Sequence, residues 1–253
     1  MKRYGLIGYP LSHSFSEKYF SEKFIREEIE DCSYELFPLE NIEDVRLLFE
    51  VNKDLEGLNV TIPYKETVIQ YLDDLDEVAE KIGAVNCIKI DEIQKIGYNT
   101  DHAGFRDSIK NLIKKHHHKA LILGTGGSSK AIAFALKEIG LDFKYVSRTK
   151  KENQFIYEDL NKSIIDEYPV IINCSPVGMF PHINTCPQIP YEFLSKHNLL
   201  FDLIYNPEKT MFMEKGQQQG AIIKNGLEML KLQAEYAWDI WNTPEENRRA
   251  TYP

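Results

Sequence analysis

Residues 119–149, KALILGTGGSSKAIAFALKEIGLDFKYVSRT, decide the fold class. An apolar run leads into a glycine-rich turn, an apolar helical pattern follows and ends at Gly140, and a second apolar run closes the stretch. This order predicts a strand, a helix and a parallel strand, as in the βαβ unit of dinucleotide-binding folds.

The turn itself carries glycine where a dinucleotide site needs it, at Gly124, Gly126 and Gly127. Glycine permits the tight turn and lets backbone N–H groups approach a pyrophosphate at the helix N-terminus, where the helix dipole favours negative charge. The third position of the Gly-x-Gly-x-x-Gly pattern is Ser129, a small residue but a departure from glycine. The strand-turn-helix context favours a dinucleotide site over a turn with a purely structural role.

The end of the second strand indicates which dinucleotide would bind. An NAD site usually has an acidic residue about 20 positions after the first glycine. Here no acid precedes Glu152, and the strand ends instead with Ser147, Arg148, Thr149, Lys150 and Lys151. Arg148 can grip a 2′-phosphate with its planar guanidinium, so the sequence favours NADP. The alternative is that Arg148 and the lysines form only a solvated strand end that binds no cofactor.

Strand-like and helical patterns alternate along the whole chain, which is typical of the α/β class. A first α/β unit has expected strands at residues 4–8, 33–38, 57–62 and 85–90, with helical patterns at 15–29, 42–51 and 75–82. A polar connector follows, and the unit that begins with the glycine turn continues with strands at 170–174, 199–203 and 221–224 and a last helix at 227–241. The tail after Pro244 is expected to be weakly ordered.

Composition restricts the classes of function. The chain has 253 residues, 43% of them hydrophobic, with a net charge of −9. This charge argues against a nucleic-acid surface, and no apolar run reaches the roughly 18 residues of a membrane span. The N-terminal residues show no secretory pattern, so a cytoplasmic protein is expected. The four cysteines form no CxxC pair and are expected to be reduced, mostly buried thiols.

The run His116, His117 and His118 suggests a metal site at first sight. Consecutive side chains point in different directions on a helix or a strand, and lysines flank the run. A solvated linker is the favoured interpretation, and no metal is expected.

Polar residues two positions apart recur in the first unit: Ser14 with Ser16, Asn59 with Thr61, and Asn99 with Asp101. In extended chain such residues face the same way, so each pair could present two hydrogen-bonding groups to one ligand. Ser14 with Glu17 also matches a capping box, which leaves a structural role open for the serines.

Lys65 and Asp101 are the candidate catalytic pair. Oxidation of an alcohol needs a group that takes the hydroxyl proton, which a lysine with a lowered pKa can do, and a carboxylate can orient that amine. Gln233 shares a helical face with Leu230 and Ala237, so its amide is either a buried structural group or a ligand contact.

Nine segments in order resemble the shikimate dehydrogenase family: GYPLSHSFS, GLNVTIPYK, IGAVNCI, GYNTDHAGF, LGTGGSSKA, SRT, NCSPVGM, DLIYNP and NGLEMLKLQAEYAWDIW. The resemblance covers nearly the whole chain. It implies an NADP-dependent oxidoreductase that reversibly reduces 3-dehydroshikimate to shikimate in aromatic amino-acid and chorismate biosynthesis.

The resemblance also implies an architecture: an α/β substrate-binding domain at 1–102, to which the last helix (226–253) returns, and a Rossmann-type NADP-binding domain at 103–225. It implies specific roles as well. Lys65 and Asp101 would be catalytic. The substrate would meet Ser14, Ser16, Asn59, Thr61, Asn86, Tyr205 and Gln233, and Asp101 would contact its ring hydroxyls. NADP would meet Gly124, Gly126, Gly127, Ser128, Ser147, Arg148, Thr149, Lys150 and Gly226.

Two departures from the family pattern bear on these roles. Glu17 stands where the family has proline, and Ser147 replaces an asparagine, which leaves the 2′-phosphate to Arg148 and its lysine neighbours. The alternatives are a quinate/shikimate dehydrogenase that uses NAD, and a catalytically silent dinucleotide-binding regulator. The sequence leaves a monomer and a homodimer both open.

Overall fold

The computed structural model describes residues 1–11, 14–91 and 93–243, so the expected tail after Pro244 and the end of the 226–253 segment lie outside the described residues. The chain divides into two compact units. Unit 1 comprises Met1–Thr100 and Gln233–Pro253, and unit 2 comprises Asp101–Leu232.

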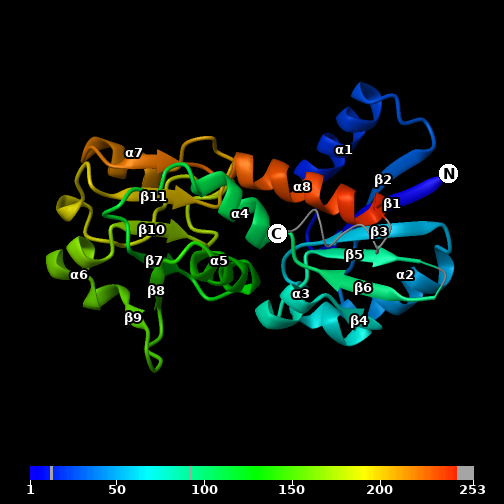
Figure 1. Ribbon diagram of the computed structural model, residues 1–253, viewed down its shortest axis with the longest axis horizontal. Coiled ribbons are helices and arrows are strands. Elements are labelled where there is room, and N and C mark those ends of the chain that lie inside the picture. Colours follow the sequence, from blue (N-terminus) through cyan, green and yellow to red (C-terminus); the bar gives the residue numbers. More distant parts are fainter. Residues whose placement is uncertain (12–13, 92, 244–253) are drawn as a thin grey trace. The chain divides into compact units, whose positions relative to one another are not determined.

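Unit 1 is built on a six-stranded sheet of order β2-β1-β3-β5-β6-β4 (Figure 1). Its strands are β1 (Lys2–Gly8), β2 (Cys32–Pro38), β3 (Leu55–Val60), β4 (Asp74–Leu75), β5 (Cys87–Ile90) and β6 (Lys95–Tyr98). β1 runs parallel to β2 and β3, whereas β5 is antiparallel to β3 and β6. β4 and β6 were not expected from the sequence, because they are only two and four residues long and β6 contains a glycine.

Helices cover both faces of this sheet. They are α1 (Phe15–Arg26), α2 (Val45–Val51), α3 (Glu77–Ile82) and α8 (Leu227–Asn242), with 3₁₀ turns η1 (Ile42–Asp44) and η2 (Thr67–Tyr71). Phe20 of α1 and Ala237 and Trp241 of α8 share one apolar cluster with Tyr4 of β1. The opposite face is covered by α2, η2 and α3. The last helix thus packs on the sheet of the first unit, as predicted.

Local chemistry sets the helix ends. The expected helix at 15–29 ends earlier, at Arg26, because the chain turns through Glu28, which has φ 55°. α3 begins where the Asp76 carboxylate accepts a hydrogen bond from the Val78 N–H, and it ends at Gly83 with φ 69°.

Unit 2 has a six-stranded sheet of order β12-β11-β10-β7-β8-β9, parallel at every pairing described. Its strands are β7 (Lys119–Leu123), β8 (Asp142–Ser147), β9 (Phe155–Ile156), β10 (Val170–Asn173), β11 (Leu199–Asp202) and β12 (Ile222–Lys224). Its helices are α4 (Asp101–Ile109), α5 (Gly127–Glu138), α6 (Lys162–Glu167) and α7 (Met211–Gln218), with 3₁₀ turns η3 (Tyr157–Asp159) and η4 (Tyr191–Phe193).

The central strands of unit 2 are buried on both faces. Ala120 and Ile122 of β7 pack toward α4 and α5, whereas Leu121 and Leu123 pack on the side of α6 and α7. The chain runs outward from β7 to β8 and then resumes on the other side at β10, so the strand order reverses beside β7. Ligands of such sheets bind at the carboxyl ends of the strands next to this reversal.

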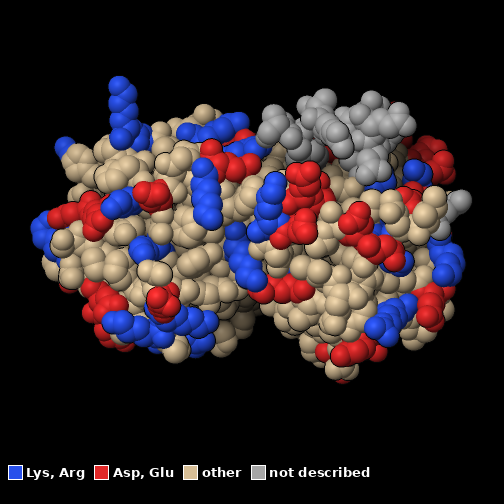
Figure 2. Space-filling view, turned by 60° about the horizontal axis from the view of Figure 1, so that its bottom comes forward, with Lys and Arg blue, Asp and Glu red and all other residues tan. Residues whose placement is uncertain are grey.

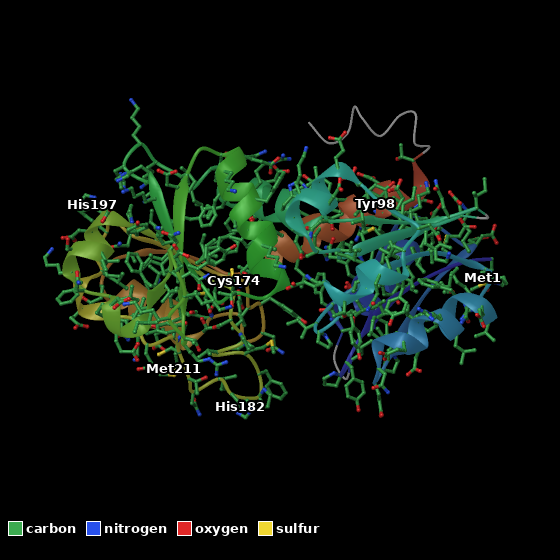
Figure 3. All side chains as sticks on the ribbon, turned by 90° about the horizontal axis from the view of Figure 1, so that it is seen from below. Met1, Tyr98, Cys174, His182, His197 and Met211 are labelled. Atoms are coloured by element: carbon green, nitrogen blue, oxygen red, sulfur yellow. The ribbon has the colours of Figure 1, made fainter. Side chains whose placement is uncertain are left out.

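Figure 3 shows the two ends of this sheet: Cys174 follows the carboxyl end of β10, whereas His197 lies at the opposite end, before β11. The predicted α/β class with a Rossmann-type second unit is confirmed. No helix within the described part of the chain is long and apolar enough to cross a membrane.

The histidine run differs from the expected solvated linker at its centre. His117 is buried; its Nδ1 accepts from the Lys114 N–H at 3.1 Å, and its Nε2 lies 3.1 Å from the His197 carbonyl oxygen. Burial lowers its pKa. Within the residues described, no group of three or more His, Cys, Asp or Glu side chains could hold a metal ion.

Candidate active site

A buried network of amides and hydroxyls forms the centre of unit 1. The Asn86 Nδ2 donates to Thr100 Oγ1 at 2.9 Å and to Gln233 Oε1 at 3.2 Å, and its Oδ1 accepts from the Thr100 N–H at 2.6 Å. Thr100 Oγ1 in turn donates to the Gln233 carbonyl oxygen at 3.0 Å. These contacts fix the side chain of Asn86, and they join residues 147 positions apart in the sequence.

Asn59 extends the network because of its place on β3. Its neighbours Leu58 and Val60 lie in the apolar cluster beneath α2 and α3, so strand alternation turns Asn59 to the other face. There its Nδ2 donates to the Asn86 carbonyl oxygen at 3.3 Å, and its Oδ1 accepts from the Tyr34 hydroxyl at 2.8 Å. The amide is only 3% exposed, so the polar side of β3 faces other polar groups and not bulk water.

The two serines do not lie in extended chain, contrary to the prediction. α1 begins at Phe15, so Ser14 is its N-cap, and the Ser14 hydroxyl accepts from the Glu17 N–H at 3.4 Å. Ser16 already lies in the first turn of the helix, where its side chain is buried. The capping role that the sequence left open is therefore confirmed for Ser14.

In the other two polar pairs, Asn59 lies in β3 with Thr61 directly after it, and Asp101 is the first residue of α4. Thr61 lies beyond β3, is half-buried, and donates its N–H to the Ile7 carbonyl oxygen at 2.9 Å. Asn99 donates to the Ala84 carbonyl oxygen at 2.8 Å. Thr100, between Asn99 and Asp101, joins the network, and a rule that considers residues two positions apart does not select it.

Lys65 belongs to unit 1, and Asp101 belongs to unit 2. Lys65 is half-buried in the turn after β3, and its carbonyl oxygen accepts from the Val85 N–H at 2.7 Å, which ties this turn to the residue before Asn86. Asp101 is 5% exposed and is the first residue of α4, where the helix dipole favours a carboxylate. It directly follows Thr100 of the network.

In unit 2, the glycine turn joins β7 to α5. Gly124 has φ 108°, which L-residues rarely adopt, and Gly126 is the N-cap of α5. A Cβ built at Gly126 would meet no atom within 4 Å, so the N-terminus of α5 opens onto free space. Gly127 and Ser128 begin the helix, and the Ser129 hydroxyl donates to the Gly126 carbonyl oxygen at 2.6 Å. Serine in the third motif position therefore stabilises the turn.

The predicted 2′-phosphate residues follow β8. The Ser147 hydroxyl donates to the Thr149 carbonyl oxygen at 2.5 Å and closes the turn. Arg148, Thr149 and Lys150 are exposed, and Lys150 lies 3.9 Å from an Asp159 carboxylate oxygen. Ser147 therefore serves the turn with its hydroxyl, and the guanidinium of Arg148 is the strongest group here for a phosphate.

A second buried network, not found from the sequence, holds the ends of β10 and β11. Asp202 accepts from Asn173 Nδ2 at 3.0 Å, from the Ile204 N–H at 3.1 Å and from the Thr210 hydroxyl at 2.5 Å. Burial raises its pKa to about 6, and these three hydrogen bonds lower it in part. The network fixes the segment that carries half-buried Tyr205, whose pKa burial also raises.

Gly226 is required by close packing, since a Cβ there would lie 2.1 Å from the Leu203 carbonyl oxygen.

Asn173 and Asp202 could have been found from the sequence, because they are the first residues of the motifs NCSPVGM and DLIYNP, at the ends of buried strands. Figure 2 shows basic and acidic side chains interspersed on the face in view.

Comparison with known proteins places these two units in one family. A family model described as the shikimate dehydrogenase substrate binding domain matches residues 6–88. The shikimate dehydrogenase (NADP(+)) of Caldanaerobacter subterraneus subsp. tengcongensis is 36% identical, over 95% of this chain and 91% of that protein. The chain belongs to the shikimate dehydrogenase family.

Solved structures of the family agree in fold. The shikimate 5-dehydrogenase of Thermus thermophilus, in complex with NADP(H) and shikimate, has a TM-score of 0.85 and 29% identity, and the match covers 96% of this chain and 94% of that one. The Listeria monocytogenes shikimate 5-dehydrogenase, in complex with shikimate and NAD, has a TM-score of 0.82 and 27% identity, covering 97% and 93%. The family resemblance seen in the nine motifs is thereby confirmed.

Proposed function

We propose that this protein is an NADP-dependent shikimate dehydrogenase, which reversibly reduces 3-dehydroshikimate to shikimate in aromatic amino-acid and chorismate biosynthesis. The observation that carries the proposal is the buried network of Asn59, Asn86, Thr100 and Gln233. A polyhydroxylated ring needs several donors and acceptors held in fixed directions, and four interlocked polar side chains supply them without charge.

The substrate roles follow from chemical type. Ser14, Ser16 and Tyr205 would donate hydroxyl hydrogen bonds to the carboxylate. Ring hydroxyls would meet Asn59, Thr61, Asn86, Asp101 and Gln233. Ser14 would keep its capping role, since its oxygen can accept from the Glu17 N–H while its proton is donated elsewhere.

The residues of unit 2 fit NADP. The open N-terminus of α5, with Gly124, Gly126, Gly127 and Ser128, offers N–H groups for a pyrophosphate. Arg148, with Thr149, Lys150 and the turn that Ser147 closes, offers cationic and polar groups for the 2′-phosphate. Gly226 would pass close to the nicotinamide. When bound, NADPH supplies the hydride for the carbonyl carbon.

Lys65 would give a proton to the carbonyl oxygen during reduction and take it back during oxidation. Asp101 would orient the ammonium group and accept a hydrogen bond from the same hydroxyl, so that the transferred proton has a defined path. The buried start of α4 supports this role, because the helix dipole there favours a negatively charged side chain.

The proposal includes the domain roles and the location. Residues 1–102 with 226–253 would bind the substrate and residues 103–225 the cofactor, and the family model matched at 6–88 supports the first assignment. A cytoplasmic enzyme is expected. Two alternatives would replace this proposal: a quinate/shikimate dehydrogenase that uses NAD, and a catalytically silent dinucleotide-binding regulator.

The variant Lys65→Ala tests the chemistry. We expect its kcat for shikimate oxidation to fall by about a hundredfold or more, the range of a lost general acid–base group, while the Kd for NADP changes less than about twofold. Lys53→Ala, which alters an exposed lysine of the same unit, is the control and should keep wild-type values. Wild-type NADP binding without shikimate turnover would instead favour the regulator.

A further inference from the structure

Tyr34 lies in the middle of β2 and is not among the residues to which substrate contact is assigned above. Its ring stacks on Phe20 of α1 with centroids 4.6 Å apart, and the side chain is buried. The hydroxyl therefore cannot swing to solvent, and it donates to one of the proposed substrate-binding residues, Asn59.

The direction of the hydrogen bond fixes the Asn59 amide. A tyrosine hydroxyl has one proton, and here it is donated to Asn59 Oδ1 at 2.8 Å. This contact leaves Asn59 Nδ2 on the opposite side, where it donates to the Asn86 carbonyl oxygen at 3.3 Å. An amide rotated by 180° would place its oxygen against the Asn86 carbonyl oxygen, where neither atom can donate, and it would leave the Tyr34 proton without its acceptor.

We propose that Tyr34 is a positioning residue for substrate binding, which holds the Asn59 amide in one orientation. The inference rests on the proposed function, because Asn59 is one of the residues assigned to the ring hydroxyls. Tyr34 makes no substrate contact of its own and acts through Asn59. Without its hydroxyl, the contact with the Asn86 carbonyl oxygen would hold the amide alone, and the amide would be oriented less firmly.

The variant Tyr34→Phe keeps the ring and its stacking on Phe20 and removes only the hydroxyl. We expect the KM for shikimate to rise about tenfold, the size of one lost buried hydrogen bond, with kcat changed less than about threefold and the KM for NADP unchanged. The matched control is Tyr4→Phe. Tyr4 lies in the same apolar cluster, and its hydroxyl donates to Asn242 Oδ1 at 3.4 Å, away from the network. Tyr4→Phe should lower thermal stability about as little as Tyr34→Phe does, and it should leave the KM for shikimate and the KM for NADP unchanged.

A double-mutant cycle separates positioning from general loosening of the unit. In an Asn59→Ala background the added Tyr34→Phe change should raise the KM for shikimate less than about threefold, since the amide to be oriented is gone. Three outcomes would each overturn the proposal. The KM for shikimate could be unchanged or lowered in Tyr34→Phe alone, it could rise equally in Tyr4→Phe, or Tyr34→Phe could still raise it tenfold in the Asn59→Ala background. A wild-type enzyme without shikimate turnover would overturn the proposed function and this inference together, whereas normal wild-type turnover with an unaltered Tyr34→Phe enzyme overturns the inference alone.

Discussion

At the scale of single residues, the proposed substrate site depends on side chains that have two tasks. Ser14 caps α1 and Ser16 lies buried in the first turn of that helix, although the two are separated by one residue only. Their roles can be told apart, because a lost cap acts on stability and a lost ligand contact acts on KM.

The variants Ser14→Ala and Ser16→Ala should therefore differ. Ser14→Ala is expected to lower the free energy of unfolding by up to about 1 kcal/mol, as for other helix caps, and also to raise the KM for shikimate. Ser16→Ala should raise that KM with a smaller change in stability. Thermal melts and initial rates on both variants check this. Equal stability loss with no change in KM for either serine would remove them from the binding site.

At the scale of elements, each proposed site is placed by the end of a strand and the start of the next helix. Gly126 ends the turn between β7 and α5 with φ −83°, a conformation that any L-residue can adopt. A side chain at this position is therefore tolerated by the fold, and it would occupy the space in front of the helix N-terminus where the pyrophosphate is proposed to bind.

The variant Gly126→Val should fold with a melting temperature within a few degrees of wild type, because a Cβ at this position meets no atom within 4 Å. Its KM for NADP should be at least about tenfold higher, because the side chain blocks the anion. Its KM for shikimate should not change. Gly226→Ala offers the contrast, since its Cβ would clash with the Leu203 carbonyl oxygen and lower the melting temperature. Unimpaired NADP binding by Gly126→Val would place the cofactor elsewhere.

The Asp202 network joins the segments after β10 and β11 and should make stability depend on pH. Burial raises the pKa of Asp202 from 3.8 to about 6, so the folded protein binds the proton more tightly than the unfolded chain. The stabilisation from this proton is complete below pH 4 and is lost as the pH rises through 6, about 3 kcal/mol in all.

The side chain in the variant Asp202→Asn cannot titrate, whereas wild type loses this stabilisation as the pH rises. The free energy of unfolding of the variant minus that of wild type should therefore increase by up to about 3 kcal/mol between pH 4 and pH 7. Urea unfolding of both proteins at several pH values measures this difference and cancels the contribution of the other carboxylates. A difference that stays constant with pH would show that Asp202 keeps an ordinary pKa.

At the scale of the whole molecule, the sequence predicted the parts that depend on local pattern. The glycine turn and the buried strands of unit 2 follow from periodicity and turn chemistry, and the family resemblance implied the return of α8 to the first sheet. The i, i+2 rule failed for Ser14 and Ser16, because the helix begins between them. The contacts of Tyr34 with Asn59 and of Asn86 with Gln233 could not be predicted, since they join residues 25 and 147 positions apart and depend on tertiary packing.

The pairing of substrate and cofactor tests the central claim most directly. Initial rates of NADPH or NADH formation are measured with shikimate or quinate as substrate and NADP or NAD as cofactor. We expect the highest kcat/KM for shikimate with NADP, far above quinate with NAD, because Arg148 and its neighbours offer a 2′-phosphate site without a strand-end acid. Equal kcat/KM values for the two pairs, or a preference for quinate with NAD, would contradict it.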